Sequence, residues 1–262
     1  MVELELESKE SIGKIVIKDA LKKFRSPTVV WSAGKDSTVV LNLVMEVVRE
    51  NSFKLPPVLF IDHGDHFPET WDMLNKYTGE WGLKLIIAKN EKVINSVHNG
   101  VIKLSEIGEE NIAEAKRVGF TGDTFSYSLD TDVGNHLLKT VAMNQTIRRY
   151  GFDALFTGIR WDENAARSTE KFLSPRDNPP HTRVHPILPF RERDIWDYMF
   201  KHNLPIHPKY KEGFRSIDGV RDSTKTSDKP AWEQDLEGTK ERAGRSQDKE
   251  GMMEKLRKMG YM

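Results

Sequence analysis

Short apolar runs alternate with segments of helical periodicity along most of this chain, and this alternation limits the fold more than any other feature. Continuous apolar runs predict buried strands at residues 28–31, 56–62, 83–90, 152–158 and 183–189. Apolar side chains that recur every three or four residues predict helices at residues 12–24, 39–47, 68–81, 135–150 and 191–203. Strands separated by helices predict an α/β fold, namely a doubly wound parallel sheet of about five strands with helices on both faces.

Two stretches break the alternation. Residues 101–134 are rich in Gly, Ser, Thr and Asp, and they predict an insertion or a mobile loop. Residues 207–250 lack clear periodicity and are dense in charge. A long irregular segment in an otherwise compact chain is more often functional or disordered than a simple connector.

The composition excludes several classes of function. The 40 Lys and Arg residues balance 40 Asp and Glu residues, so no overall field recruits nucleic acid or an anionic membrane. Since the sequence has no cysteine, it offers no disulfide framework, thiolate metal site or thiol nucleophile. The opening is acidic and no apolar run reaches membrane-spanning length, which predicts a soluble cytoplasmic protein.

The segment WSAGKDS places a loop of small residues between a predicted strand and a predicted helix. Unpaired N–H groups and the positive end of the helix dipole gather at such a junction and form an anion site. Small side chains let an anion reach the backbone, Lys35 adds a mobile charge, and Ser37 adds a hydroxyl donor. The residues expected to hold the anion are Ser32, Ala33, Gly34, Lys35, Asp36 and Ser37.

This loop is not a Walker loop, which needs two glycines separated by four residues before Lys-Ser/Thr. An ordinary tight turn between strand and helix, with Asp36 or Ser37 capping the helix, is the alternative to an anion site.

The letters SAGKDS resemble the Ser-Gly-Gly-Lys-Asp-Ser pyrophosphate loop of the adenine nucleotide α-hydrolase superfamily, whose members cleave ATP between its α and β phosphates. The sequence departs from that pattern at Ala33, where the family usually has glycine. A positive φ would strain alanine, so we expect a negative φ at Ala33 or a slightly reshaped loop.

Further segments resemble one branch of this superfamily, which contains phosphoadenylyl-sulfate reductases and ATP sulfurylase small subunits. They keep the branch's order and read IDHGDHFPET, YGFDALFTGIRWDENAARS and TRVHPILPFRERDIWDYM. The last segment, TKERAGRSQDKEGMMEKLRKMGYM, looks like the carboxyl end of the ATP sulfurylase small subunit. The resemblance covers roughly residues 20–262 and is closest to that small subunit.

The resemblance implies a nucleotide-binding α/β PP-loop domain over residues 1–190. It also implies a carboxyl-terminal helix with a lid-like extension packed on the site over residues 191–262. The implied reaction uses ATP and Mg²⁺ and transfers the adenylyl group to sulfate, giving adenylyl sulfate and pyrophosphate. Since this reaction is steeply uphill, the resemblance also implies a separate GTPase large subunit as partner, and it leaves open a homo-oligomer.

Arg160 and Arg167 follow the fourth predicted strand, so both can lie at the carboxyl edge of the sheet, where doubly wound folds bind ligands. Guanidinium groups match phosphate and sulfate oxygens bidentately, although surface ion pairs with Asp162 or Glu163 are the alternative. The resemblance implies that Lys35, Arg160 and Arg167 are catalytic. The further residues that it places at the nucleotide or oxyanion are Asp62, Gly158, Asp162, Arg183, Arg242 and Arg245.

Two assignments stay open in this region. Asp162 and Glu163 would either orient the arginines or bind Mg²⁺. Arg242 and Arg245 belong either to a solvated charge run or to a flexible segment that closes over the nucleotide and excludes water.

The close spacing of Asp62, His63, Asp65 and His66 raises the question of a metal site, because imidazole and carboxylate groups are good ligands. The resemblance instead places this stretch at the lip of the nucleotide pocket, with Asp62 at the adenine or ribose edge. We therefore expect no metal held by protein side chains alone.

Other functions remain alternatives to transfer of the adenylyl group to sulfate. Transfer to flavin mononucleotide (FMN), as in FAD synthetase, uses the same branch of the superfamily. Reduction of phosphoadenylyl sulfate is disfavoured because such reductases need a cysteine, and tRNA base activation lacks a basic tract or zinc cysteines. A non-catalytic nucleotide-binding subunit is the alternative from outside the enzymes.

Overall fold

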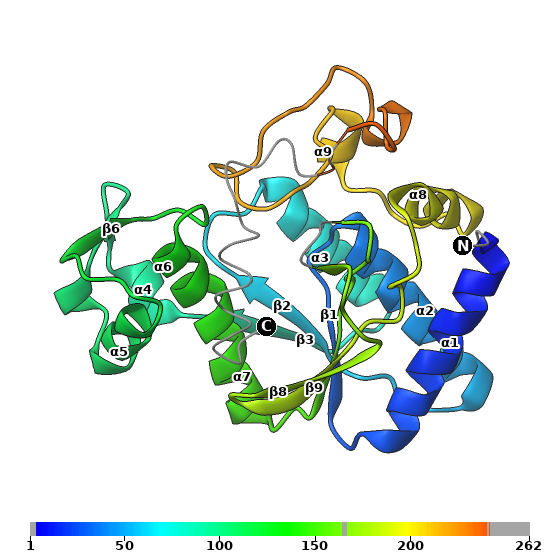
Figure 1. The fold of residues 1–262 in the computed structure, drawn as a ribbon, viewed down its shortest axis with the longest axis horizontal. Coiled ribbons are helices and arrows are strands. Elements are labelled where there is room, and N and C mark those ends of the chain that lie inside the picture. Colours follow the sequence, from blue (N-terminus) through cyan, green and yellow to red (C-terminus); the bar gives the residue numbers. More distant parts are fainter. Residues whose placement is uncertain (1–3, 164–166, 240, 242–262) are drawn as a thin grey trace.

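The computed structural model describes residues 4–163, 167–239 and 241. Within these residues the main sheet has six strands in the order β3-β2-β1-β7-β9-β8 (Figure 1). The strands are β1 (Pro27–Val30), β2 (Val58–Asp62), β3 (Leu85–Lys89), β7 (Ala154–Phe156), β8 (Leu173–Asp177) and β9 (Pro180–Val184). Neighbouring strands pair in parallel except β8, which pairs antiparallel with β9. The predicted α/β fold with a parallel sheet is confirmed.

The edge strand β8 and its neighbour β9 differ from the prediction. The sequence does not predict β8, which contains Pro175 and forms a hairpin with β9. An edge strand tolerates proline because one side of it needs no ladder hydrogen bond. The strand predicted at residues 183–189 has the wrong bounds, since β9 begins at Pro180 and ends before Pro186.

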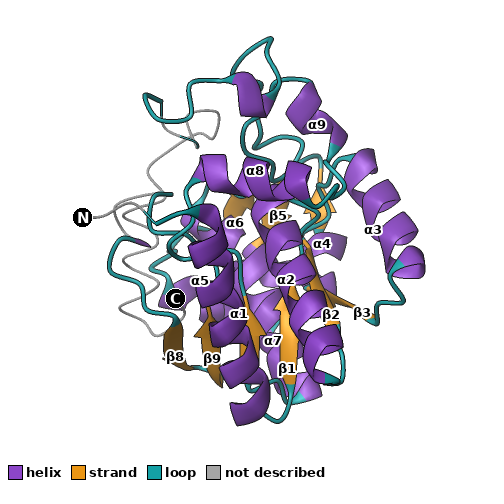
Figure 2. Ribbon diagram, turned by 90° about the vertical axis from the view of Figure 1, so that its right-hand side faces the viewer, coloured by secondary structure: helices purple, strands orange, loops and turns teal. Residues whose placement is uncertain are grey.

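Helices cover both faces of this sheet (Figure 2). They are α1 (Leu6–Lys23), α2 (Lys35–Asn51), α3 (Pro68–Glu80), α7 (Ala142–Tyr150) and α8 (Glu192–Lys201). Helices α1 and α8 pack on α2, whereas α7 packs on β2 and β3. Successive side chains of β2 explain the two layers. Phe60 joins the apolar cluster that contains α2, and Leu59 joins a second cluster with Met143 and Ile147 of α7.

An insertion between β3 and α7 has a core of its own and lies on the left in Figure 1. Its elements are α4 (Glu91–Asn95), β4 (Val97–His98), β5 (Val101–Lys103), a 3₁₀ turn (Leu104–Glu106), α5 (Glu109–Arg117), β6 (Thr124–Ser126), α6 (Asp132–Asn135) and a π-helical stretch (His136–Val141) that leads into α7. Ile102, Ala115 and Phe125 are buried together in this core. The predicted insertion is confirmed, but the alternative of a loop is wrong. Strands of two or three residues are too short to show an alternating pattern.

After α9 (Pro208–Lys211) the chain is mostly irregular, as its lack of periodicity predicts. We call residues 212–239, together with Glu241, the strap; it contains a short 3₁₀ turn (Ala231–Glu233) and passes beside α8 and α9 (Figure 1). Tyr210 and Ala231 are buried in the same apolar cluster as the main sheet. The strap is therefore packed onto the sheet domain through this cluster. In the described part of the chain, no helix is long and apolar enough to cross a membrane.

Candidate functional site

The loop between β1 and α2 is strained at one residue. Ala33 has a φ of 59°, contrary to the expected negative φ. A left-handed conformation costs a non-glycine residue roughly 1–2 kcal/mol. The methyl group of Ala33 is only 1% exposed and packs in the main apolar cluster, so its burial offsets part of this cost.

The first turn of α2 has no side-chain cap, and its N-cap residue is Gly34. The Lys35 amide donates a hydrogen bond of 3.1 Å to the Tyr210 hydroxyl. The Ser37 hydroxyl accepts from the Ser32 amide at 3.2 Å and lies 3.0 Å from the Gly34 carbonyl, to which it can donate. Neither Asp36 nor Ser37 caps α2, so the capping that the alternative of an ordinary turn expects is absent.

A cavity of about 220 Å³ lies at this helix terminus. The predicted site residues that line it are Ser32, Gly34, Lys35, Asp36, Ser37, Gly158 and Arg167. Glu163, expected either to orient the arginines or to bind Mg²⁺, also lines it; the polar lining residues that the sequence analysis did not single out for binding are Thr157, Tyr210, Ser216 and Glu241. The cavity thus combines the head of α2, the segment after β7, and residues that are far away in the sequence.

Gly158 lets the end of β7 approach the first turn of α2. A Cβ atom at this position would lie 2.9 Å from the carbonyl carbon of Asp36 and 3.0 Å from the amide nitrogen of Ser37. Both atoms are backbone atoms of a helix, so they cannot rotate away. Any larger residue would displace the helix terminus that lines the cavity.

Lys35 is a buried cation at the centre of the site, with only 2% of its surface exposed. Its Nζ atom contacts Glu241 Oε1 and lies 3.3 Å from Asp36 Oδ2 and 3.9 Å from Glu192 Oε1. The ring of Tyr210 lies 5.7 Å from the same nitrogen. The Lys35 ammonium is therefore held within the site rather than extended into solvent.

Arg160 is fully buried and faces the same carboxylates from the β7 side. Its guanidinium group contacts Asp36 Oδ1, Asp162 Oδ1 at 2.9 Å and Glu241 Oε2 at 2.5 Å. Burial alone would lower the pKa of Arg160, but the carboxylates of Glu241, Asp162 and Glu192 outweigh it and raise that pKa. Arg160 is therefore a permanent positive charge at the site.

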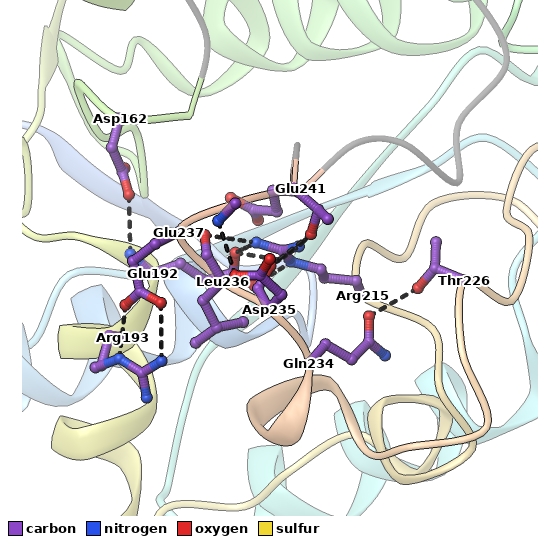
Figure 3. A network of polar contacts seen from close by, with 12 residues as sticks. Asp162, Glu192, Arg193, Arg215, Thr226, Gln234, Asp235, Leu236, Glu237 and Glu241 are labelled. Atoms are coloured by element: carbon purple, nitrogen blue, oxygen red, sulfur yellow. Dashed lines mark hydrogen bonds and ion pairs between the residues drawn. The ribbon is translucent and has the colours of Figure 1, made fainter.

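A second buried ion pair joins α8 to the strap. Arg215 is 2% exposed, and its guanidinium group donates to both carboxylate oxygens of Glu192, at 2.8 to 3.2 Å. It also donates to the carbonyl oxygens of Asp235 and Leu236, at 3.0 and 2.9 Å (Figure 3). In turn, the Glu192 amide donates to Asp162 Oδ2 at 2.9 Å. This network fixes the strap relative to the end of β7.

Arg167 and Arg183 occupy different positions. Arg167 lines the cavity and contacts Glu163. Arg183 does not line the cavity; it is buried on β9, where burial and the neighbouring Arg176 lower its pKa to about 10. His185, on the same strand segment, lies 2.6 Å from the hydroxyl of Thr157, which does line the cavity.

Asp62 lies at the end of β2, away from the residues that line the cavity. Its carboxylate accepts from the Gly64 amide at 2.8 Å and pairs with Lys89 at 2.9 Å. His66 lies 3.6 Å from Asp62, and burial lowers the pKa of His66 to about 4 despite this neighbour. In the described residues, no group of three or more His, Asp or Glu side chains could hold a metal ion.

The structure therefore brings together part of the predicted site. Lys35, Asp36 and Arg160 meet through direct contacts, and Asp162 joins them through Arg160. Arg242 and Arg245 lie outside the described residues. Sequence reasoning missed Tyr210, Arg215 and Glu241 because they follow α8 in a region without periodicity. The only signal was that Glu241 opens the segment ERAGR, which belongs to the stretch that carries the family resemblance.

A family model described as "Phosphoadenosine phosphosulfate reductase domain" matches residues 26–225. Sulfate adenylyltransferase subunit 2 of Shewanella amazonensis is 28% identical over 236 residues, which cover 81% of this chain and 69% of that protein. The same subunit of Geotalea uraniireducens is 28% identical, with 77% and 66% covered. The matched region thus spans about two thirds of the length of these relatives.

Solved structures share the fold at low identity. The FMN adenylyltransferase of Candida glabrata has a TM-score of 0.66 and 16% identity, and the match covers 93% of this chain and 88% of that chain. The phosphoadenylyl-sulfate reductase of Candida auris has a TM-score of 0.59 and 18% identity, with 85% and 99% covered.

Proposed function

Because the chain belongs to the phosphoadenosine phosphosulfate reductase domain family, which matches residues 26–225, we propose that it cleaves ATP between its α and β phosphates and transfers the adenylyl group to sulfate. The observation that carries this proposal is the pair of buried cations, Lys35 and Arg160, at the head of α2. Such a helix terminus favours anions, and the two cations add charge where a polyphosphate needs it.

The choice of sulfate as acceptor rests on the relatives. Two proteins at 28% identity are named sulfate adenylyltransferase subunit 2. The 262 residues contain no cysteine, so reduction by a thiol has no nucleophile in this sequence. Both observations favour adenylyl transfer over the reduction that the name of the family describes.

In this proposal the residues Ser32–Ser37 hold the departing pyrophosphate. A sulfate oxygen attacks the α-phosphorus, the bond to the oxygen that bridges the α- and β-phosphates breaks, and pyrophosphate leaves with that oxygen. Phosphoryl chemistry needs little covalent help, so Lys35 and Arg160 act by position and by stabilising the developing negative charge. Arg167 at the cavity wall contacts the attacking oxyanion, and Arg183 adds positive charge from β9.

Mg²⁺ fits the site if it enters with the nucleotide. A magnesium ion usually takes one or two carboxylates and completes its shell with phosphate oxygens and water. Asp36 and Glu163 line the cavity and offer such oxygens. The ion would neutralise charge on the phosphates, while Asp162 keeps its bond to Arg160 as a positioning group.

The name "subunit 2" of the relatives supports a partner. Because formation of adenylyl sulfate is uphill, we propose that a separate large subunit with GTPase activity drives the reaction. The purified chain alone then catalyses the favourable reverse direction.

A second candidate acceptor is FMN. The fold matches an FMN adenylyltransferase with a TM-score of 0.66, and another structure of that enzyme is a complex with ATP. The two candidates share the pyrophosphate loop and differ only in the acceptor.

The reverse reaction separates the candidates. The chain, Mg²⁺ and pyrophosphate are mixed with either adenylyl sulfate or FAD, and ATP is measured with luciferase. The proposal predicts ATP from adenylyl sulfate and none from FAD. If only the mixture with FAD yields ATP, the acceptor is FMN and not sulfate. If the chain binds pyrophosphate but neither mixture yields ATP, the chain is a non-catalytic nucleotide-binding subunit.

A further inference from the structure

The side chain of Glu241 occupies the position between the two buried cations. Its Oε1 atom contacts Lys35 Nζ, and its Oε2 atom contacts Arg160 Nη2. Only 8% of this side chain is exposed, and Glu241 also lines the cavity at the head of α2. One carboxylate therefore engages, through its two oxygens, the same two cations that the proposed pyrophosphate site uses.

The strap brings Glu241 to this position from a distant part of the sequence. Arg215 anchors the strap through Glu192 on α8 and through the carbonyl oxygens of Asp235 and Leu236. It also contacts the hydroxyl of Thr239, two residues before Glu241. Because Arg215 is buried and has several partners, the end of the strap is fixed close to the cavity.

While Glu241 is in place, the carboxylates around Lys35 and Arg160 disfavour the binding of a polyphosphate. Among the described residues, the cations Lys35 and Arg160 face four carboxylates, which belong to Asp36, Asp162, Glu192 and Glu241. A phosphate group that enters between the two cations must take the position of the Glu241 carboxylate, since each oxygen of the carboxylate uses a donor that the phosphate needs. The cavity volume of about 220 Å³ also lies below the roughly 300–1,000 Å³ that is typical of small-molecule sites.

We propose that Glu241 is an internal competitor of the substrate, whose carboxylate holds the oxyanion position between Lys35 and Arg160 until a phosphate group displaces it. This inference rests on the proposed function and adds the regulation of its site. Displacement moves only the end of the strap, because the contacts of Arg215 with Glu192, Asp235 and Leu236 do not involve Glu241. The displaced carboxylate stays tethered near the cavity, so it returns when pyrophosphate leaves.

The Glu241 carboxylate also stabilises the protein when no ligand is bound. Its two oxygens form ion pairs with the buried side chains of Lys35 and Arg160, and loss of one partner from a buried ion pair is destabilising. Glu241 thus stabilises the unliganded protein and weakens the binding of the substrate by the same contact. The two effects are linked, because any contact made only in the empty state must be lost on binding.

The test uses inorganic pyrophosphate and the full chain. Glu241→Gln keeps the shape of the side chain and removes its charge. If Glu241 holds the position about 90% of the time, its removal tightens pyrophosphate binding about tenfold, because the affinity scales with the fraction of competent molecules. Isothermal titration calorimetry with Mg²⁺ measures the dissociation constant, and thermal unfolding is expected to show a lower Tm for the unliganded variant.

Glu237→Gln is the matched control. Glu237 lies on the same strap, is exposed, and pairs with Arg193 at 2.8 and 3.1 Å outside the cavity. The proposal predicts no change in pyrophosphate affinity for this variant. Glu241→Asp serves as a second variant if Glu241→Gln does not fold; its shorter side chain reaches one cation at a time, so it also binds pyrophosphate more tightly than the unmodified chain.

The possible outcomes separate this inference from the proposed function. Tighter binding in Glu241→Gln or Glu241→Asp, but not in Glu237→Gln, supports the competitor. Unchanged or weaker binding in the Glu241 variants overturns it while leaving the proposed function intact, since Glu241 would then act as a ligand or a positioning residue. If neither the unmodified chain nor its variants bind pyrophosphate, both proposals fail.

Discussion

The carboxyl ends of β1 and β2 are neighbours in the sheet but carry opposite chemistry. After β1 the chain turns through small residues into α2, and Lys35 lies at its head. At the end of β2 it places Asp62 next to His63 and His66, whose rings are tilted by 35° and have centroids 3.7 Å apart. The β1 end favours a polyphosphate, whereas the β2 end presents a carboxylate and buried imidazoles, which suit hydrogen bonding to an uncharged part of a ligand.

The comparison shows how one sheet edge can separate the parts of a nucleotide. On the β1 side two buried cations, Lys35 and Arg160, share several carboxylates, and Glu241 contacts both of them. On the β2 side Lys89 pairs with Asp62 and Lys139 pairs with Asp218, so each cation there is matched by its own carboxylate. We therefore expect phosphates at β1 and propose, as the family resemblance implies, that Asp62 contacts the adenine or ribose.

The largest expected effect is the loss of the β1 cation. Lys35→Ala removes the charge that faces the departing pyrophosphate, so turnover in the reverse reaction falls by about 100-fold. Lys89→Ala, at the β2 end, is the control, because its amino group pairs with Asp62 and does not line the cavity. Equal losses of turnover in the two variants would remove the distinction between the two strand ends. Circular dichroism checks that both variants fold.

The next largest effect concerns the contact between β7 and the β1 loop. Gly158→Ala places a Cβ atom within 3.0 Å of backbone atoms of Asp36 and Ser37. We expect a loss of stability of about 1–3 kcal/mol from overpacking and about a tenfold loss of turnover. Gly79→Ala is the matched control, since a Cβ atom there meets nothing within 4 Å. Urea unfolding and the reverse assay measure both effects, and normal turnover in Gly158→Ala would show that the close approach is not needed.

A smaller effect at the β2 end is the dependence of the free energy of unfolding on pH. The pKa of His66 is lowered to about 4 in the folded chain, from 6.5, mainly by burial. Between these values the unfolded chain binds a proton that the folded chain does not, so this residue lowers the free energy of unfolding as pH falls from about 6.5 to about 4. The expected slope is up to about 1.4 kcal/mol for each pH unit.

Urea unfolding at pH 7 and pH 5 measures this slope. His66→Gln is expected to reduce it, although His181 and His207, with pKa values also lowered to about 4, keep part of it. The exposed His98, substituted in the same way, is the control and should leave the slope unchanged. A slope that His66→Gln does not reduce would contradict a neutral, buried imidazole at the β2 end.

The smallest effect concerns strain in the two loops. The β2 loop uses glycine, Gly64, at a φ of 82°, whereas the β1 loop uses Ala33 at a φ of 59°. Ala33→Gly relieves strain but loses a buried methyl group, so stability should change by only about 1 kcal/mol. Ala20→Gly, at an equally buried position in α1, gains no such relief and should cost roughly 1 kcal/mol more than Ala33→Gly. Equal costs would show that Ala33 stores no strain.

The sequence predicts the sheet domain well, because the pattern of strands and helices is local. The run from Val58 to Asp62 and the periodic apolar face of α2 need no knowledge of distant contacts. The loop of small residues between β1 and α2 was predicted for the same reason, as its small residues and Lys35 are contiguous. β8 was missed because an edge strand that contains Pro175 has no strand signal of its own.

The part of the site contributed by the strap could not be predicted. Tyr210 of α9 and Glu241 line the cavity, and Arg215 anchors the strap beside it, because the chain folds back over the sheet; no period in the sequence encodes that return. Their contacts with Lys35 and Glu192 join residues far apart in the chain. Only the three-dimensional arrangement shows that a carboxylate lies between the two cations.

A crystal structure with Mg²⁺ and a non-hydrolysable ATP analogue tests the central claim most directly. The account predicts that the β and γ phosphates lie against the amides of Ser32–Ser37, that Lys35 and Arg160 contact them, and that the Glu241 carboxylate has moved away. Phosphates bound beside Asp62 and His66 at the end of β2, with Glu241 still between Lys35 and Arg160, would contradict it.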